Sequence, residues 1–216
     1  TFTYYGFRYC LVSGITEEQA TKDLLTYTVM SSDLKQNGDF HCSDELANKL
    51  QRATYNSDIS NFYYFPTDCP HREKNGWTSE GHVSSEFILY NNNCVETLKE
   101  WYFNIQCAQR EDGAIPGIVP TAGWGFNWGS GPQWDAILVE LPLYIYKFTD
   151  DVEFLRSCVG SVINYIHYVI TTEGSLVMYG METMNAVTKG NQPWIDQKEN
   201  IETVIIDEDI TTVEAY

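Results

Sequence analysis

A short segment in the first half of the chain gathers side chains that can donate and accept protons. Residues 66–80 read Pro-Thr-Asp-Cys-Pro-His-Arg-Glu-Lys-Asn-Gly-Trp-Thr-Ser-Glu. Cleavage of a glycosidic bond needs a carboxylic acid that stays protonated near neutral pH and donates to the leaving oxygen. Carboxylates and an apolar ring close to such an acid favour its protonated form, through charge repulsion and desolvation. The segment therefore contains the residue types that such acid catalysis would need.

Glu73 is the candidate proton donor of this segment. Asp68, Glu80 and the ring of Trp77 are close to it in sequence and would favour its protonated form. Glu80 is expected at a helix N-terminus, where the helix dipole favours the charged form. The pKa values of Glu73 and Glu80 are therefore expected to differ. The two flanking cations oppose this, because an ion pair would hold Glu73 ionised. The alternative interpretation is a solvated charged turn without catalytic function.

Helical periodicity dominates the chain after residue 42. Long loops are expected at 65–76 and 111–131, and a loop of about twenty residues in a compact domain is usually functional. Alternating short and long connections predict antiparallel helix pairs with the long loops at one end. Helices are predicted from Ser43 to Phe62, from Thr78 or Ser79, from Asn93 (capping box with Glu96) to Asp112-Gly113, after Pro132 with a kink at Pro142, and from Asp150 to Gly174.

The first forty residues have a different character. Residues 2–13 are rich in aromatic and β-branched types and stop at Ser13-Gly14, which predicts a strand and a turn. A second strand is expected near residues 24–30. The chain begins without methionine, so we expect that its start was cut from a longer chain.

Composition restricts the class of partner. Thirteen basic residues face thirty acidic ones, and a net charge of −17 repels phosphate backbones and anionic lipid, so neither nucleic acid nor a membrane is an expected partner. Six tryptophans and fifteen tyrosines are typical of sugar-binding proteins, although aromatic residues also fill cores. The scattered cysteines indicate no zinc site or disulfide framework and predict mostly buried free thiols in a reducing compartment such as the cytoplasm: Cys10, Cys42, Cys69, Cys94, Cys107 and Cys158.

The string from Pro66 to Glu80 resembles the hallmark of the bacterial α-L-rhamnosidases of the inverting six-hairpin type. The family pattern is Pro-Thr-Asp-Cys-Pro-x-Arg, then Glu, and shortly afterwards Gly-Trp-Thr-Gly-Asp. The resemblance implies a mainly α fold, a partial (α/α) six-hairpin toroid preceded by a short β segment from a β-sandwich. Residues 1–40 would be the sandwich remnant and linker, and residues 41–216 the N-terminal half of an (α/α)6 catalytic domain. Further segments that match are 2–9, 38–43, 113–116 and 131–136.

The same resemblance assigns roles within the string. Glu73 falls on the general acid, Asp68 and Arg72 fall on residues that hold the rhamnose hydroxyls, and Trp77 falls on a wall of the sugar pocket. Glu80, also assigned to the pocket, replaces the aspartate of the family pattern, and the longer side chain could shift its carboxylate by about 1.5 Å.

Further sugar contacts are assigned around the second loop. Trp128 and Trp134 would supply an aromatic platform, although each is equally well explained as a core residue. Asp135 would either bind sugar or cap the helix that follows Pro132.

The function implied by the resemblance is single-displacement hydrolysis of terminal α-L-rhamnose from oligosaccharides or glycosides, without metal or redox cofactor. The base that activates water should lie about 6.5–9.5 Å from the acid. The available carboxylates Glu199, Glu202 and Glu208 stand in no recognisable motif, so we expect the base to lie outside this chain and the chain alone to be inactive. The alternatives are a non-catalytic relative with a rhamnose pocket, a six-hairpin glycosidase for another sugar, and a helical interaction module.

Overall fold

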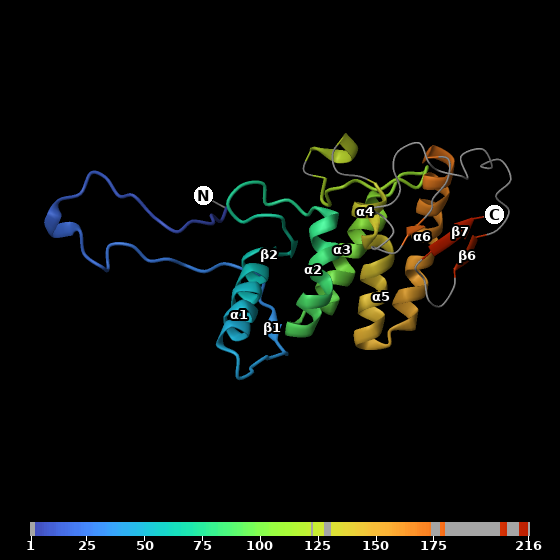
Figure 1. The fold of residues 1–216 in the computed structure, drawn as a ribbon. Helices are drawn as coiled ribbons and strands as arrows, with labels where there is room; N and C mark the ends of the chain where they lie inside the picture. Colours follow the sequence, from blue (N-terminus) through green and yellow to red (C-terminus); the bar gives the residue numbers. More distant parts are fainter. Residues whose placement is uncertain are drawn as a thin grey trace.

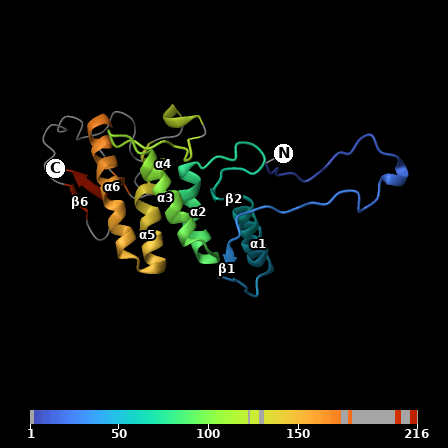
Figure 2. The same cartoon turned by 180° about the vertical axis from the view of Figure 1, so that it is seen from behind.

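The structure is a computed structural model that describes residues 3–121, 123–127, 131–173, 178–179, 204–206 and 212–215. Four long helices stand side by side in it: α2 (Thr78–Asn91), α3 (Val95–Ala108), α5 (Ile137–Thr149) and α6 (Val152–Glu173) (Figure 1). Helix α1 (Glu45–Ser60) stands at the edge of this group, on the side of the N-terminal segment (Figure 2). The predicted mainly helical class is confirmed.

The helix starts differ by a residue or two from the predictions, for local reasons. Helix α1 begins after Asp44 rather than Ser43, because the Asp44 carboxylate accepts a 2.8 Å hydrogen bond from the N–H of Leu46. The predicted capping box of α3 is wrong. Asn93 belongs to β4 (Asn92–Asn93), which pairs antiparallel with β1 (Lys35–Gln36), and the helix begins after Cys94 and ends at Ala108.

The helix predicted after Pro132 is divided into two. Helix α4 (Pro132–Asp135) ends at Ala136, and α5 continues through Pro142. Proline has no N–H, so the carbonyl four residues earlier loses its usual partner. The Tyr102 hydroxyl of α3 donates to this carbonyl, that of Leu138, at 2.9 Å. A tertiary contact therefore replaces the missing bond, and the break between the two helices lies at Ala136. The kink at Pro142 stays a prediction.

The N-terminal segment forms no strand in residues 3–34, so the strands predicted over 2–13 and 24–30 are wrong where the structure describes them. A strand needs a neighbour for its hydrogen bonds, and this segment pairs with none. It extends away from the helices as a loop (Figure 1), with Tyr9 89% and Leu11 96% exposed. A single 3₁₀ turn, Glu17–Gln19, is described within it. The division of the chain near residue 40 stays a prediction.

Short strands complete the described elements. β2 (Phe62–Tyr63) and β3 (Phe65–Pro66) form an antiparallel hairpin between α1 and the loop that carries Glu73. Beside α6, β5 (Met178–Tyr179), β6 (Val204–Ile206) and β7 (Thr212–Ala215) form an antiparallel sheet in the order β5-β7-β6.

The core lies between α2, α3, α5 and α6. Trp101 of α3 is at its centre, and its indole N–H donates to the carbonyl of Val119 in the long second loop at 2.8 Å. The loop is thereby fixed to the helices that support it. Side chains exposed by 2% or less in this core are Phe62, Ile88, Cys94, Leu98, Trp101, Tyr102, Ile105, Ile115, Val119, Ile137, Leu138, Leu141, Ile145, Cys158 and Val169.

The six cysteines are all described and all free, as predicted, with Cys69, Cys94 and Cys158 buried. The prediction that most are buried is wrong, because Cys10 and Cys107 are exposed and Cys42 is half-buried. Among the helices of the described ranges, none combines the length and apolar character that a bilayer crossing requires.

Candidate active site

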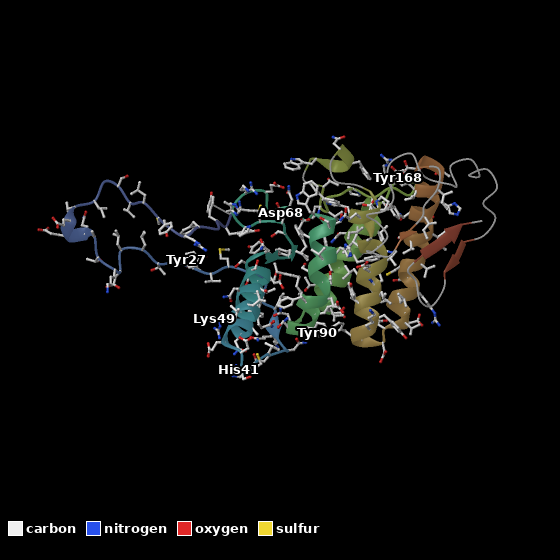
Figure 3. All side chains as sticks on the ribbon, viewed as in Figure 1. Tyr27, His41, Lys49, Asp68, Tyr90 and Tyr168 are labelled. Atoms are coloured by element: carbon white, nitrogen blue, oxygen red, sulfur yellow. The ribbon has the colours of Figure 1, made fainter. Side chains whose placement is uncertain are left out.

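The loop of residues 66–77, called the acid loop below, is closed by Asp68 and Asn75. The Asp68 N–H donates to the Asn75 carbonyl at 3.1 Å, and the Asn75 N–H donates to Asp68 Oδ1 at 2.9 Å. The Cys69 thiol donates to Asp68 Oδ2 at 3.0 Å. Both carboxylate oxygens of Asp68 therefore shape the loop, and each keeps capacity for a further donor. Asp68 lies between the N-terminal segment and α2 (Figure 3).

Glu73 and Trp77 come together in the acid loop, as the sequence predicts. The Trp77 indole N–H donates to Glu73 Oε2 at 2.8 Å, and the Glu73 N–H donates to Cys69 Sγ at 3.3 Å. Glu73 is otherwise exposed. The expectation that the Trp77 ring desolvates Glu73 is wrong in one respect. Trp77 meets the carboxylate through its indole N–H.

The cations that flank Glu73 do not pair with it. None of the ion pairs within the described ranges involves Glu73. Arg72 is exposed, and the Lys74 ammonium donates to the Arg72 carbonyl at 3.2 Å. The ion pair that would keep Glu73 ionised is therefore absent from this arrangement.

The acid loop is joined to the second long loop directly before α2. The Thr78 N–H donates to the Gly117 carbonyl at 2.9 Å, and the Val119 N–H donates to the Gly76 carbonyl at 2.8 Å. The Trp77 ring meets the Trp124 ring edge-on, with centroids 6.0 Å apart. The acid loop and the second long loop therefore lie together at one end of the helices, as predicted.

Trp124 is a member of this site that the sequence analysis missed. The number of tryptophans in the second loop pointed to an aromatic contact there. Hydrophobic periodicity, however, does not show which tryptophan of that loop contacts Trp77. Trp128, one of the two selected, lies outside the described residues.

Glu80 stands in the first turn of α2, as expected from the sequence. The Ser79 hydroxyl donates to Glu80 Oε2 at 2.6 Å. Ser79 and Glu80, the two residues that depart from the family pattern, thus contact each other. One oxygen of the Glu80 carboxylate already accepts a hydrogen bond from the serine.

Asp135 of α4 is buried, with 2% of its surface exposed. Its Oδ2 accepts from the N–H of Gly131, the residue before α4, at 3.1 Å, so it does cap this helix start. Burial raises the pKa of Asp135 to about 6, against the lowering effect of the Tyr165 hydroxyl and the Gly131 N–H.

Trp134 precedes Asp135 and is half-buried. Its indole Nε1 is buried and has no hydrogen-bond partner in the described part of the chain. An indole N–H placed in this way can donate a hydrogen bond to the oxygen of a sugar hydroxyl. Helices α4 and α2 pack together, so both residues belong to the end of the bundle that carries Glu80.

A separate hollow of about 530 Å³ lies between residues 29–34 and α1, where Tyr55, Ile59 and Tyr63 line it. None of the candidate residues lines this hollow. In the described ranges, no group of three or more His, Cys, Asp or Glu side chains is placed to hold a metal ion.

Comparison with known proteins gives the family. Residues 35–207 match the family model described as the bacterial alpha-L-rhamnosidase 6 hairpin glycosidase domain. An alpha-L-rhamnosidase of Formosa agariphila is 28% identical over 201 residues, which are 92% of this chain and 21% of that protein. The chain spans 11–21% of the length of the curated relatives that it matches.

Two solved structures agree with this match. The alpha-L-rhamnosidase from Dictyoglomus thermophilum superposes with a TM-score of 0.65 over 69% of this chain and 17% of that one, at 24% identity, which supports the fold. The Streptomyces avermitilis alpha-L-rhamnosidase, solved in complex with L-rhamnose, gives a TM-score of 0.59 over 66% of this chain and 14% of that one, at 25% identity. With a family model that matches most of its length, the chain belongs to the six-hairpin glycosidase domain family of the bacterial α-L-rhamnosidases.

Proposed function

We propose that this chain supplies the proton-donating half of the active site of an inverting α-L-rhamnosidase, with Glu73 as the general acid. The hydrogen bond between Trp77 Nε1 and Glu73 Oε2 carries this assignment. This bond joins the exposed Glu73 carboxyl group to the Trp77 ring at the place where the acid loop meets the second long loop. An acid at such a junction can reach a glycosidic oxygen without leaving its support.

In the proposed reaction Glu73 protonates the leaving oxygen while a second carboxylate activates water on the opposite face of the sugar. Inverting enzymes place these carboxyls about 6.5–9.5 Å apart. We propose that this base lies outside this chain. Asp68, Arg72 and Glu80 would hold sugar hydroxyls, and Asp135 would act with them from α4.

The proposed substrate is a terminal α-L-rhamnoside. The methyl group of rhamnose is apolar and suits a wall of aromatic rings such as Trp77, Trp124 and Trp134. The relative from Streptomyces avermitilis that was solved with L-rhamnose supports this choice of sugar.

The test uses a protein in which this chain forms part of a complete six-hairpin domain. We expect hydrolysis of aryl α-L-rhamnosides in preference to aryl glucosides and glucuronides, and preference for another sugar would overturn the substrate assignment. Glu73→Gln should lower kcat by about 10²–10⁴-fold and leave rhamnose binding, followed by tryptophan fluorescence, intact. Glu111→Gln, a change of an exposed glutamate in the second loop, is the matched control.

A non-catalytic sugar-binding protein is the second candidate, and the contact between Ser79 and Glu80 favours it. A pocket carboxylate held by a neighbouring hydroxyl is less available to a substrate. This alternative predicts a rhamnose-induced change in tryptophan fluorescence without turnover. A helical interaction module would give neither signal.

We also propose a cytoplasmic location, on the basis of the six free thiols. Cell fractionation tests it, and recovery outside the cytoplasm would contradict it.

A further inference from the structure

Among the ion pairs of the described residues, none joins the Lys74 ammonium to the carboxylate of Glu73, which precedes it in the chain. Lys74 has a left-handed backbone conformation, with φ of 57°, directly after Glu73. Its Nζ donates to the Arg72 carbonyl at 3.2 Å and lies 5.7 Å and 5.5 Å from the ring centroids of Tyr4 and Tyr5. Both ring distances are within the range of cation–π attraction.

The two tyrosines belong to the N-terminal segment, which is fixed to the acid loop at two places. The Gly6 N–H donates to the Pro70 carbonyl at 3.1 Å, and the approach is so close that a Cβ on Gly6 would lie 2.9 Å from Pro70 Cγ. The Tyr4 ring also packs on Tyr63 of β2, with centroids 4.9 Å apart. The rings that face Lys74 are therefore held against the loop.

The charge balance around Glu73 depends on where this ammonium lies. Ile118 and Trp124 of the second loop contact Trp77, and the sequence from 113 to 127 includes no titratable side chain. Arg72 and Lys74 are the cations next in sequence to Glu73, and the ammonium of Lys74, on a four-carbon stem, can turn toward a neighbouring carboxylate. The titratable groups besides Glu73 in residues 4–8, in the acid loop and in the first turn of α2 are Tyr4, Tyr5, Arg8, Asp68, Cys69, His71, Arg72, Lys74 and Glu80.

We propose that Tyr4 and Tyr5 are positioning residues that hold the Lys74 ammonium away from Glu73, so that the proposed acid is not paired with this neighbouring cation. A cation paired with a carboxylate favours the ionised form, which cannot donate. The inference rests on the proposed function of Glu73. It assigns Tyr4 and Tyr5 of the N-terminal segment a positioning role for the proposed acid.

The first test measures the position of Lys74 without reference to activity. Trace acetylation of a protein with a complete six-hairpin domain, read by peptide mass spectrometry, compares Lys74 with Lys49, which is exposed on α1 (Figure 3). In the variant Tyr4→Leu/Tyr5→Leu we expect Lys74 to react several-fold faster relative to Lys49. Tyr4→Phe/Tyr5→Phe keeps the rings and should react as the parent does. Tyr9→Leu, a change of an exposed tyrosine of the same segment, is the control.

The second test measures the pH profile of kcat/KM with an aryl α-L-rhamnoside. Surface ion pairs are weak, so we expect the basic limb of Tyr4→Leu/Tyr5→Leu to move toward lower pH by about half a unit. Adding Lys74→Met to that variant should return the limb to its original position. In the parent, Lys74→Met should leave the limb where it is, because the ammonium is already held away. If Tyr4→Leu/Tyr5→Leu does not fold, Lys74→Met alone still tests the proposal, because a shifted basic limb in this variant would contradict it.

The outcomes separate this inference from the proposed function. An unchanged acetylation rate for Lys74 in the leucine pair overturns the ring contact. A limb that stays in place although Lys74 is released, or one that moves in Lys74→Met alone, overturns its effect on Glu73. Full activity of Glu73→Gln overturns the proposed function, whatever the acetylation rates are.

Discussion

Cys69 links the two carboxyl-bearing residues of the acid loop through one sulfur atom. Its thiol donates to Asp68 Oδ2, and its sulfur accepts the N–H of Glu73. The side chain is buried, so water cannot easily replace either contact. At the scale of single residues, the position of the proposed acid therefore depends on Cys69.

We predict that Cys69→Ala lowers kcat about tenfold with little change in KM, because the backbone before Glu73 loses a contact that fixes it. Cys69→Ser keeps a donor and an acceptor and should retain more activity than the alanine variant. Steady-state kinetics on an aryl α-L-rhamnoside measure both. Equal rates for alanine variant and parent would show that the sulfur does not position the acid.

Trp101 of α3 connects the supporting elements to the site. Its ring fills the space beside Gly81 of α2, where a Cβ would overlap the ring carbons. Its indole N–H holds Val119 of the second loop, and Phe65 of β3 stacks at 6.5 Å on the same ring. At the scale of elements, one side chain sets how closely α2 approaches α3 and where both loops begin.

Gly81→Ala should therefore destabilise the fold by about 1–3 kcal/mol, since the added methyl forces the buried Trp101 ring to move. The matched control is Gly160→Ala in α6, where nothing lies within 4 Å of the new methyl. That variant should gain up to about 1 kcal/mol from helix propensity. Urea denaturation gives both values, and a Gly81→Ala protein as stable as the parent would contradict the packing described.

Over the whole molecule, the described core is formed by α2, α3, α5 and α6, while α1 has no fully buried residue. Asp58 lies on the inner side of α1, and its Oδ2 is buried with no hydrogen-bond partner within the described ranges. Burial raises the pKa of Asp58 to about 7. The folded protein thus binds this proton more tightly than the unfolded chain does.

The sign of the resulting pH effect follows from linkage. The stabilisation from the Asp58 proton is complete below about pH 4 and is lost as the pH rises through about 7. Asp58→Asn should be more stable than the parent at pH 8, by about 1 kcal/mol after allowing for partial exposure to solvent, and the gain should shrink toward pH 4. Urea denaturation across this range measures it, with the exposed Asp23→Asn as control. A gain that does not depend on pH would contradict the assignment.

The sequence predicted the features that depend on local pattern. The helices at 78–91 and 152–173 follow from periodicity, and the fixed string that contains Glu73 and Trp77 located their contact. The strand predicted at 2–13 failed because a strand requires a partner that local composition does not reveal. The effect of Pro142 depended on Tyr102, forty residues earlier, which donates to the carbonyl that the proline leaves free.

Two features of the site were beyond prediction for a similar reason. The contact between Trp77 and Trp124 joins two loops far apart in the chain. The contact of Lys74 with Tyr4 and Tyr5 is also a long-range contact. In our proposal this contact decides whether Glu73 meets the Lys74 ammonium. The sequence shows which charged residues are close to an acid in the chain, but only the folded structure shows which groups their side chains contact.

The most direct measurement of the role of Glu73 compares two substrates in a protein with a complete six-hairpin domain. A 2,4-dinitrophenyl α-L-rhamnoside releases a stable phenolate that needs no proton, whereas a 4-methylphenyl α-L-rhamnoside needs a proton donor. If Glu73 is the general acid, Glu73→Gln lowers kcat/KM by about 10²–10⁴-fold on the 4-methylphenyl substrate and far less on the dinitrophenyl one. An equal loss on both substrates, or no loss on either, would contradict that role.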